Sequence, residues 1–254
     1  MEQIIRQRLY EIEKTQNVRI LFAVESGSRA WGIASPDSDY DVRFIYVRPK
    51  NDYLRLDEFR DVIELPIGDE LDINGWDLKK ALALLYRSNP TLFEWLSSPV
   101  IYLKTRFAED FKGLAADYFS EKKSLYHYVS MAKGNYRGYL KGDIVKAKKY
   151  FYVLRPVLAC RWIIDKNTPP PMLFSELEEH ELPVALKKEV ETLLDIKINS
   201  PEIKEIPRID ALNEFLDEEI SSVKSKIDTM KEEQNNDWDK LNEFFLSVLS
   251  DNEV

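Results

Sequence analysis

The stretch that most constrains the fold of this chain is residues 24–47, in which a tight-turn motif and a loop separate two segments with strand character. Residues 18–24 form a short apolar run with several β-branched side chains, which is typical of a buried strand, and Gly27 and Ser28 follow it. Residues 39–47 then alternate between polar and apolar side chains, the period of a strand. The sequence therefore predicts a strand, a glycine turn, a loop and a second strand.

Within the second segment, Asp39, Asp41 and Arg43 fall on one face, because successive side chains of a strand point to opposite sides. Two carboxylates on one face repel each other unless a positive charge lies between them. A hard divalent cation with oxygen ligands is a common source of that charge in proteins. The pattern therefore predicts a cation site at these aspartates.

The composition is that of a globular protein. Of the 254 residues, 44% are hydrophobic and 32% are charged, and no uncharged apolar run reaches the roughly 20 residues needed to cross a bilayer. The charged N-terminus has no secretory pattern, so we expect a cytoplasmic protein with no membrane partner. One cysteine, Cys160, and two histidines, His127 and His180, leave carboxylates, hydroxyls and basic groups to carry any chemistry.

The net charge of -9 is distributed unevenly along the chain. Residues 122–161 carry ten Lys and Arg side chains and one acid, whereas residues 175–254 carry 22 acids and nine bases. We call residues 122–161 the basic belt. Tyrosines are interleaved with its basic residues, at positions 126, 128, 136, 139, 150 and 152. Such a mixture suits phosphates and stacked bases, although a solvated helix face with tyrosines packed inward would have the same pattern.

Other periodicities indicate an α/β part at the start of the chain. Residues 1–16 have the spacing of an amphipathic helix. Residues 61–66 and 70–73 resemble the arms of a hairpin around residues 67–69, and we expect a further turn at Asn74-Gly75, before a helix.

From Arg106 onward the periodicity is helical nearly to the end of the chain. We therefore expect an α+β fold, α/β in the broad sense, with two domains. A small mixed sheet with flanking helices would occupy residues 1–105. An all-helical domain in residues 106–254 would contain the basic belt and the acidic C-terminal region, and would close a nucleotide cleft.

The chemistry expected of residues 27–41 is an in-line attack on a phosphoryl centre. Gly27 lets the backbone approach a phosphate, Ser28 offers its hydroxyl and backbone N–H, and Arg29 adds charge. Carboxylates would hold two Mg²⁺ ions about 3.5 to 4 Å apart, with Mn²⁺ as a substitute, and Asp72 lies on a later expected strand. Such a reaction needs positioning and charge neutralisation more than His or Cys side chains.

These residues resemble a known family. Gly27-Ser28, followed after ten residues by Asp39-Tyr40-Asp41-Val42, resembles the signature of the DNA polymerase β-type nucleotidyltransferase superfamily. Four segments in order, residues 27–32, 38–43, 72–78 and 149–155, are similar to a bacterial and phage group of predicted nucleotidyltransferases linked with RNA repair. The resemblance spans roughly residues 18–175.

The resemblance implies roles for individual residues. Asp39 and Asp41 would be the paired metal ligands, Ser28 the triphosphate contact, and Asp72 the third carboxylate, which activates the acceptor hydroxyl. Asp77 is the alternative to Asp72, but it lies in the expected first turn of a helix, where an acid complements the helix dipole.

In the helical part, Lys149, Tyr152 and Arg155 are spaced to share roughly one helix face and could meet the triphosphate and the base of a nucleotide. Tyr152 could equally be a core residue. The sequence thus assigns nucleotide contacts to both parts of the chain.

Three functions remain open from the sequence. The first is Mg²⁺-dependent transfer of a nucleoside monophosphate from an NTP, for which we favour ATP, to the hydroxyl of an RNA end such as that of a tRNA. The second is nucleotidylation of a protein hydroxyl by an antitoxin-like or regulatory enzyme. The third is a non-catalytic nucleotide-binding module.

Overall fold

The structure is a computed structural model that describes residues 1–57, 59–66, 70–200, 204–231 and 237–251. The chain folds as two compact units. The first unit contains residues 1–27 and 39–119 together with helix α11 (Trp238–Asp251). The second contains residues 28–38 and the chain from Ser120 to the end of helix α10 (Asp210–Thr229).

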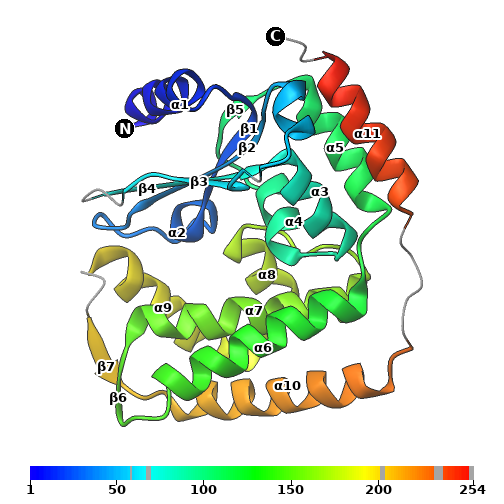
Figure 1. Cartoon of the computed structure of the whole chain (residues 1–254). Coiled ribbons are helices and arrows are strands. Elements are labelled where there is room, and N and C mark those ends of the chain that lie inside the picture. The colour runs from blue at the N-terminus through cyan, green and yellow to red at the C-terminus, as the bar shows by residue number, and fades with distance from the viewer. Residues whose placement is uncertain (58, 67–69, 201–203, 232–236, 252–254) are drawn as a thin grey trace. The chain divides into compact units, whose positions relative to one another are not determined.

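A five-stranded mixed sheet forms the centre of the first unit (Figure 1). Its strand order is β3-β4-β2-β1-β5. Strands β2 and β4 are parallel, and every other neighbouring pair is antiparallel. The predicted α+β class and small mixed sheet are therefore confirmed. The strands are β1 (Arg19–Ser26), β2 (Tyr40–Val47), β3 (Val62–Glu64), β4 (Leu71–Asp77) and β5 (Ile101–Lys104).

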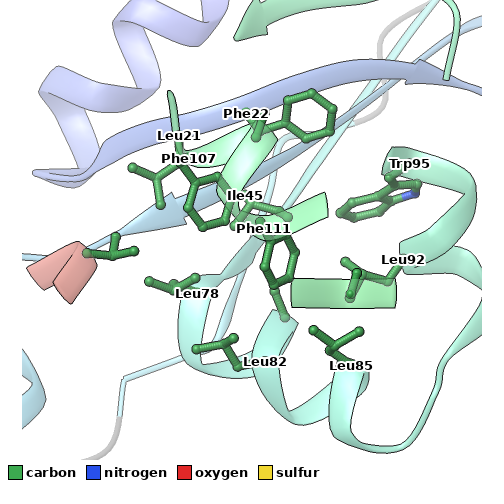
Figure 2. Close-up of a cluster of buried hydrophobic side chains, with 14 of the residues drawn as sticks. Leu21, Phe22, Ile45, Leu78, Leu82, Leu85, Leu92, Trp95, Phe107 and Phe111 are labelled. Carbon is green, nitrogen blue, oxygen red and sulfur yellow. The ribbon is translucent and has the colours of Figure 1, made fainter. Parts of the chain in front are cut away.

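Helices cover both faces of this sheet. On one face, Ile5, Leu9 and Ile12 of α1 (Glu2–Gln16) pack on a cluster that includes Phe44 and Tyr46. On the other face, the first unit's remaining helices bury a second cluster, whose labelled members include residues from β1, β2 and three helices (Figure 2). These helices are α3 (Leu78–Tyr86), α4 (Pro90–Leu96), α5 (Arg106–Ala116) and α11, and a short 3₁₀ helix, η1 (Lys50–Leu54), follows β2.

The division of the chain differs from the expected boundary near residue 105. Helix α5, placed by that boundary in the helical domain, packs on β1, so the first unit continues to Phe119. Helix α11 also belongs to the first unit: Trp238 stacks on Tyr86 of α3 with ring centroids 3.8 Å apart. Aromatic side chains in the acidic C-terminal region thus attach its last helix to the sheet unit.

The second unit is mostly helical but contains a short antiparallel pair, β6 (Ile144–Lys146) with β7 (Glu205–Pro207). The expectation of an all-helical domain is corrected at this point. Its helices are α6 (Glu121–Tyr139), α7 (Ala147–Lys166), α8 (Phe174–Glu181), η2 (Val184–Leu186), α9 (Lys187–Asn199) and α10, and α2 (Gly27–Ala30) starts in the first unit and ends in the second. Over the described residues, no helix combines the length and apolar character needed to span a bilayer.

One expected turn is wrong. Asn74 and Gly75 lie inside β4, where Gly75 pairs with Phe44 of β2 and Ile63 of β3. Gly75 is needed here because a Cβ atom would stand 2.2 Å from the Phe44 ring. The two arms of the predicted hairpin do pair, as β3 and β4, while its turn at residues 67–69 lies outside the described residues.

Candidate active site

Asp41 and Asp72 lie side by side on the two parallel strands of the sheet. The register of β2 and β4 pairs Asp41 directly with Asp72. Because side chains alternate along a strand, both carboxylates are on the face that carries Ile45 into the α3 to α5 core, beyond the end of that core. The parallel pairing explains how residues 31 positions apart come to share one site.

Arg43 links the two carboxylates. Its Nη2 donates to Asp41 Oδ1 at 3.1 Å and to Asp72 Oδ2 at 2.7 Å, and its Nη1 donates to the backbone oxygens of Val42 and Asp72. The Arg43 side chain is 18% exposed and the two carboxylates about one-third exposed. The positive charge that the strand pattern required is therefore supplied by this guanidinium, a role that the sequence reasoning did not assign.

The backbone N–H of Asp41 is held by a hydrogen bond to a buried glutamate. Glu25, on β1, is fully buried, and its Oε1 accepts the Asp41 N–H at 2.7 Å. Its Oε2 accepts a hydrogen bond from the Tyr102 hydroxyl, and Ser98 Oγ donates to its backbone oxygen at 2.7 Å. Glu25 thus connects β2 to β5 and holds Asp41 in place.

Gly27 packs directly against the Asp41 carboxylate. It has φ +62°, a conformation that side-chain-bearing residues rarely adopt, and a Cβ atom would lie 2.1 Å from Asp41 Oδ2. Glycine is therefore required at position 27 for two physical reasons. The chain needs a positive φ to turn from β1 into α2, and the Asp41 carboxylate occupies the space of a Cβ atom.

Asp39 is exposed and precedes the first paired residue of β2, Tyr40. Among the residues that the structure describes, no three His, Cys, Asp or Glu side chains are gathered as a metal site. Asp41 and Asp72 are thus brought together, whereas Asp39 does not complete a three-residue cluster with them.

Asp77, the alternative third carboxylate, has a structural role at the other end of β4. It caps α3, with Oδ1 accepting the Lys79 N–H at 2.8 Å, and Oδ2 accepts from the Tyr53 hydroxyl at 3.0 Å. Burial raises the pKa of the Asp77 carboxyl, and these two hydrogen bonds oppose the shift. The register places Asp77 beside Tyr46, five residues away from the Asp41 and Asp72 pair.

The other predicted nucleotide contacts lie in the second unit. Arg29 donates to the Ser38 backbone oxygen at 2.6 Å, and the Ser28 backbone oxygen accepts the Ile33 N–H at 3.0 Å. The bonds from Arg29 and Ile33 close the loop of residues 28–38 on itself.

The predicted helix face of Lys149, Tyr152 and Arg155 is built on α7. The Lys149 ammonium lies 4.7 Å from the Tyr152 ring centroid, and the Tyr152 ring meets Trp31 edge-on at 6.0 Å. Arg155 is only 3% exposed, and its guanidinium lies 4.8 Å from the Trp31 ring centroid. Arg155 is therefore a buried residue that packs against the Trp31 ring. The helical spacing of Lys149, Tyr152 and Arg155 did not indicate this burial.

We expect Arg43→Met to lower the free energy of unfolding by roughly 1 to 3 kcal/mol in EDTA, because two adjacent carboxylates lose their shared partner. Magnesium should raise the Tm of the variant more than that of the wild type, since a bound cation replaces the lost charge. Thermal melts with and without MgCl₂ measure both effects. The exposed pair Arg55 and Asp57 provides a control, and Arg55→Met should change neither quantity appreciably. An equal magnesium response in the two variants would contradict the expectation.

The family model for RlaP, the RNA repair pathway DNA polymerase beta family, matches residues 1–247. The chain therefore belongs to this family. The predicted resemblance is confirmed, and it extends beyond residues 18–175 to include α10 and most of α11.

Two individual proteins are also similar to this chain. The chain is 46% identical over 253 residues to the "Uncharacterized protein YcgL" of Bacillus subtilis (strain 168), covering 99% of this chain and 97% of that protein. A solved structure of a nucleotidyltransferase-like protein from Exiguobacterium sibiricum 255-15 is 11% identical, with a TM-score of 0.30, over 98% of this chain and 81% of that one.

Proposed function

We propose that this protein transfers a nucleoside monophosphate from an NTP to a hydroxyl, releasing pyrophosphate, and that the preferred acceptor is an RNA end such as that of a tRNA. The observation that carries the proposal is the direct pairing of Asp41 with Asp72 beside Gly27. Family membership supports the reaction class, and the family's description links it with RNA repair. We favour ATP as the donor.

The donor set of this site suits Mg²⁺ or Mn²⁺. Asp41 and Asp72 offer hard carboxylate oxygens, partly exposed and already adjacent, and Asp39 lies two residues before Asp41. Metal binding here would require Arg43 to give up part of its contact with the carboxylates, because its Nη2 bonds to both. Bound divalent cations would supply the positive charge that phosphoryl transfer needs.

The residues of the chain contribute positioning to this reaction. Glu25 fixes the backbone of Asp41, and Gly27 leaves room for its carboxylate. Asp72 is available on the neighbouring strand to accept the proton of the attacking hydroxyl. Ser28, Arg29, Lys149 and Tyr152 are the proposed contacts of the triphosphate and base, and the Arg155 guanidinium lies against the Trp31 ring in the same unit.

The test is labelling of RNA from NTPs radiolabelled at the α-phosphate. We expect labelling to be lost in Asp39→Asn, Asp41→Asn and Asp72→Asn, because each substitution removes a proposed metal-binding charge without changing side-chain size. Asp77→Asn is the matched control and should retain both labelling and the cap of α3, because the Oδ1 atom of Asn can still accept the Lys79 N–H. Labelling that survives in both Asp39→Asn and Asp41→Asn would refute the proposal, and label on a protein band would move the acceptor to a protein hydroxyl.

A further inference from the structure

A groove with a volume of about 510 Å³ lies between α6 and α10, within the second unit. We call it the α6–α10 groove. Its polar lining includes Lys133 and Arg137 from α6 and Lys224 and Asp228 from α10, and it is bordered by Tyr126 and Gly134. Lys224 comes from the acid-rich C-terminal region, so the fold adds a lysine to the basic belt that the sequence alone did not place there.

The positive charges of this groove are not neutralised by the described part of the protein. Among described residues, no carboxylate forms an ion pair with Lys133, Arg137 or Lys224, and Asp228 is the one acid in the lining. Lys133, Arg137 and Lys224 line the same groove, and the neighbouring Lys224, then Arg137, lower the pKa of the Lys133 ammonium because like charges repel. An anion bound among them would relieve that repulsion.

Buried hydrogen bonds join the first turn of α10 to α6 and α7, at the opposite end of α10 from Lys224 and Asp228. The side chain of Asn213 donates to the Leu140 backbone oxygen, beyond the end of α6, at 2.8 Å and accepts from the Tyr150 hydroxyl at 2.8 Å. The Tyr136 hydroxyl of α6 donates to the Asn213 backbone oxygen at 3.2 Å. At the other end, Lys122 Nζ of α6 donates to the backbone oxygen of Met230, which follows α10, at 3.0 Å. The two helices are therefore joined at both ends, and a ligand need not bring the groove walls together on binding.

The shape of the groove suits a flexible polynucleotide. Tyr126 is 66% exposed and lines the groove, where a base can stack on its ring. Gly134 leaves the α6 backbone open, since a Cβ atom there would meet nothing within 4 Å. With a net charge of -9, the chain as a whole repels polyanions, so binding of RNA requires a local cluster of uncompensated cations.

We propose that the α6–α10 groove binds the phosphate backbone of single-stranded RNA, with Lys133, Arg137 and Lys224 contacting phosphates and Tyr126 stacking on a base. This inference rests on the proposed function only in identifying RNA as the acceptor. The groove residues all belong to the second unit, whereas Asp41 and Asp72 belong to the first.

The experiment measures fluorescence anisotropy of a labelled oligouridine RNA, in EDTA and without nucleotide, over a series of KCl concentrations. The groove variant is Lys133→Glu with Lys224→Glu. The control variant is Lys188→Glu with Lys226→Glu, which changes the net charge equally at exposed positions outside the groove. Circular dichroism melts verify that both variants remain folded.

We expect the wild type and the control variant to bind RNA with a slope of log K against log salt of about -2, as for three phosphate contacts on a single strand. The groove variant should bind at least about tenfold more weakly, with a slope near -0.7, because only Arg137 remains. Tyr126→Ala should weaken binding without changing the slope.

Equal losses in the groove and control variants would overturn the proposal, as would absence of wild-type RNA binding or preferential binding of polyglutamate. Asp41→Asn separates this proposal from the proposed function. If that variant still binds RNA, the groove assignment is supported independently of catalysis. If the wild type also shows no labelling activity, nucleotidyl transfer is refuted and the groove assignment is not.

Discussion

Replacing Gly27 by alanine is expected to reduce RNA labelling about 100-fold or more, while lowering the free energy of unfolding by roughly 1 to 2 kcal/mol. The stability loss comes from φ +62°, which a residue with a Cβ atom adopts at a cost. The activity loss has a separate cause, because the new Cβ would lie 2.1 Å from Asp41 Oδ2 and must displace that carboxylate. Labelling rates and urea denaturation measure the two effects.

Gly32→Ala is the matched control for this substitution. Gly32 also has a positive φ, +77°, but its Cβ would meet only the Leu173 side chain, at 3.3 Å. It should therefore lose a similar amount of stability, with a much smaller loss of labelling. Equal losses of labelling in the two variants would show that strain in the turn and loop, rather than the position of Asp41, limits the reaction.

The sheet could be predicted from the sequence because its strands carry local signals. The apolar run before Gly27 and the alternation after Asp39 predict β1 and β2, which pair antiparallel in the structure. The turn predicted at Asn74-Gly75 was wrong, although this dipeptide is typical of turns. Glycine is required there because the Phe44 ring packs against the β4 backbone. Packing between distant segments is not visible in local sequence.

The boundary of the units was missed for a related reason. Helical periodicity from Arg106 onward indicates that α5 and α11 are helices but not which core they cover. Both bury aromatic residues, Phe107 and Phe111 of α5 and Phe244 of α11, against the same cluster. A domain assignment based on helical periodicity therefore places them with the acidic and basic helices of the second unit.

For the candidate site, the residue types were predictable and their partners were not. Asp41 and Asp72 were chosen from spacing and resemblance, and the parallel register places them side by side. The bridging position of Arg43 depends on the register of β2 and β4, which no short motif encodes. The position of Lys224 beside Lys133 and Arg137 could not be predicted either, because Lys224 lies in an acid-rich segment far from them in the sequence.

The expected effect of Gly75→Ala is on stability rather than on chemistry. A Cβ atom on this residue would lie 2.2 Å from two carbon atoms of the fully buried Phe44 ring, in the middle of the β2 and β4 pairing. Overpacking at such a site should lower the free energy of unfolding by about 3 kcal/mol, because both strands are held by neighbours and cannot move apart freely. Urea denaturation followed by circular dichroism measures the loss.

Gly138→Ala is the control, because its Cβ would meet nothing within 4 Å on helix α6, and it should stabilise the protein by roughly 0.5 to 1 kcal/mol. Phe44→Leu removes the ring that the new methyl group strikes. In the Gly75→Ala background it should therefore restore stability, although alone it should cost about 1 kcal/mol. The two substitutions are expected to be strongly non-additive, since each changes the volume at the same contact. Simple additivity would show that Gly75 is required for its backbone conformation and not for the space that Phe44 occupies.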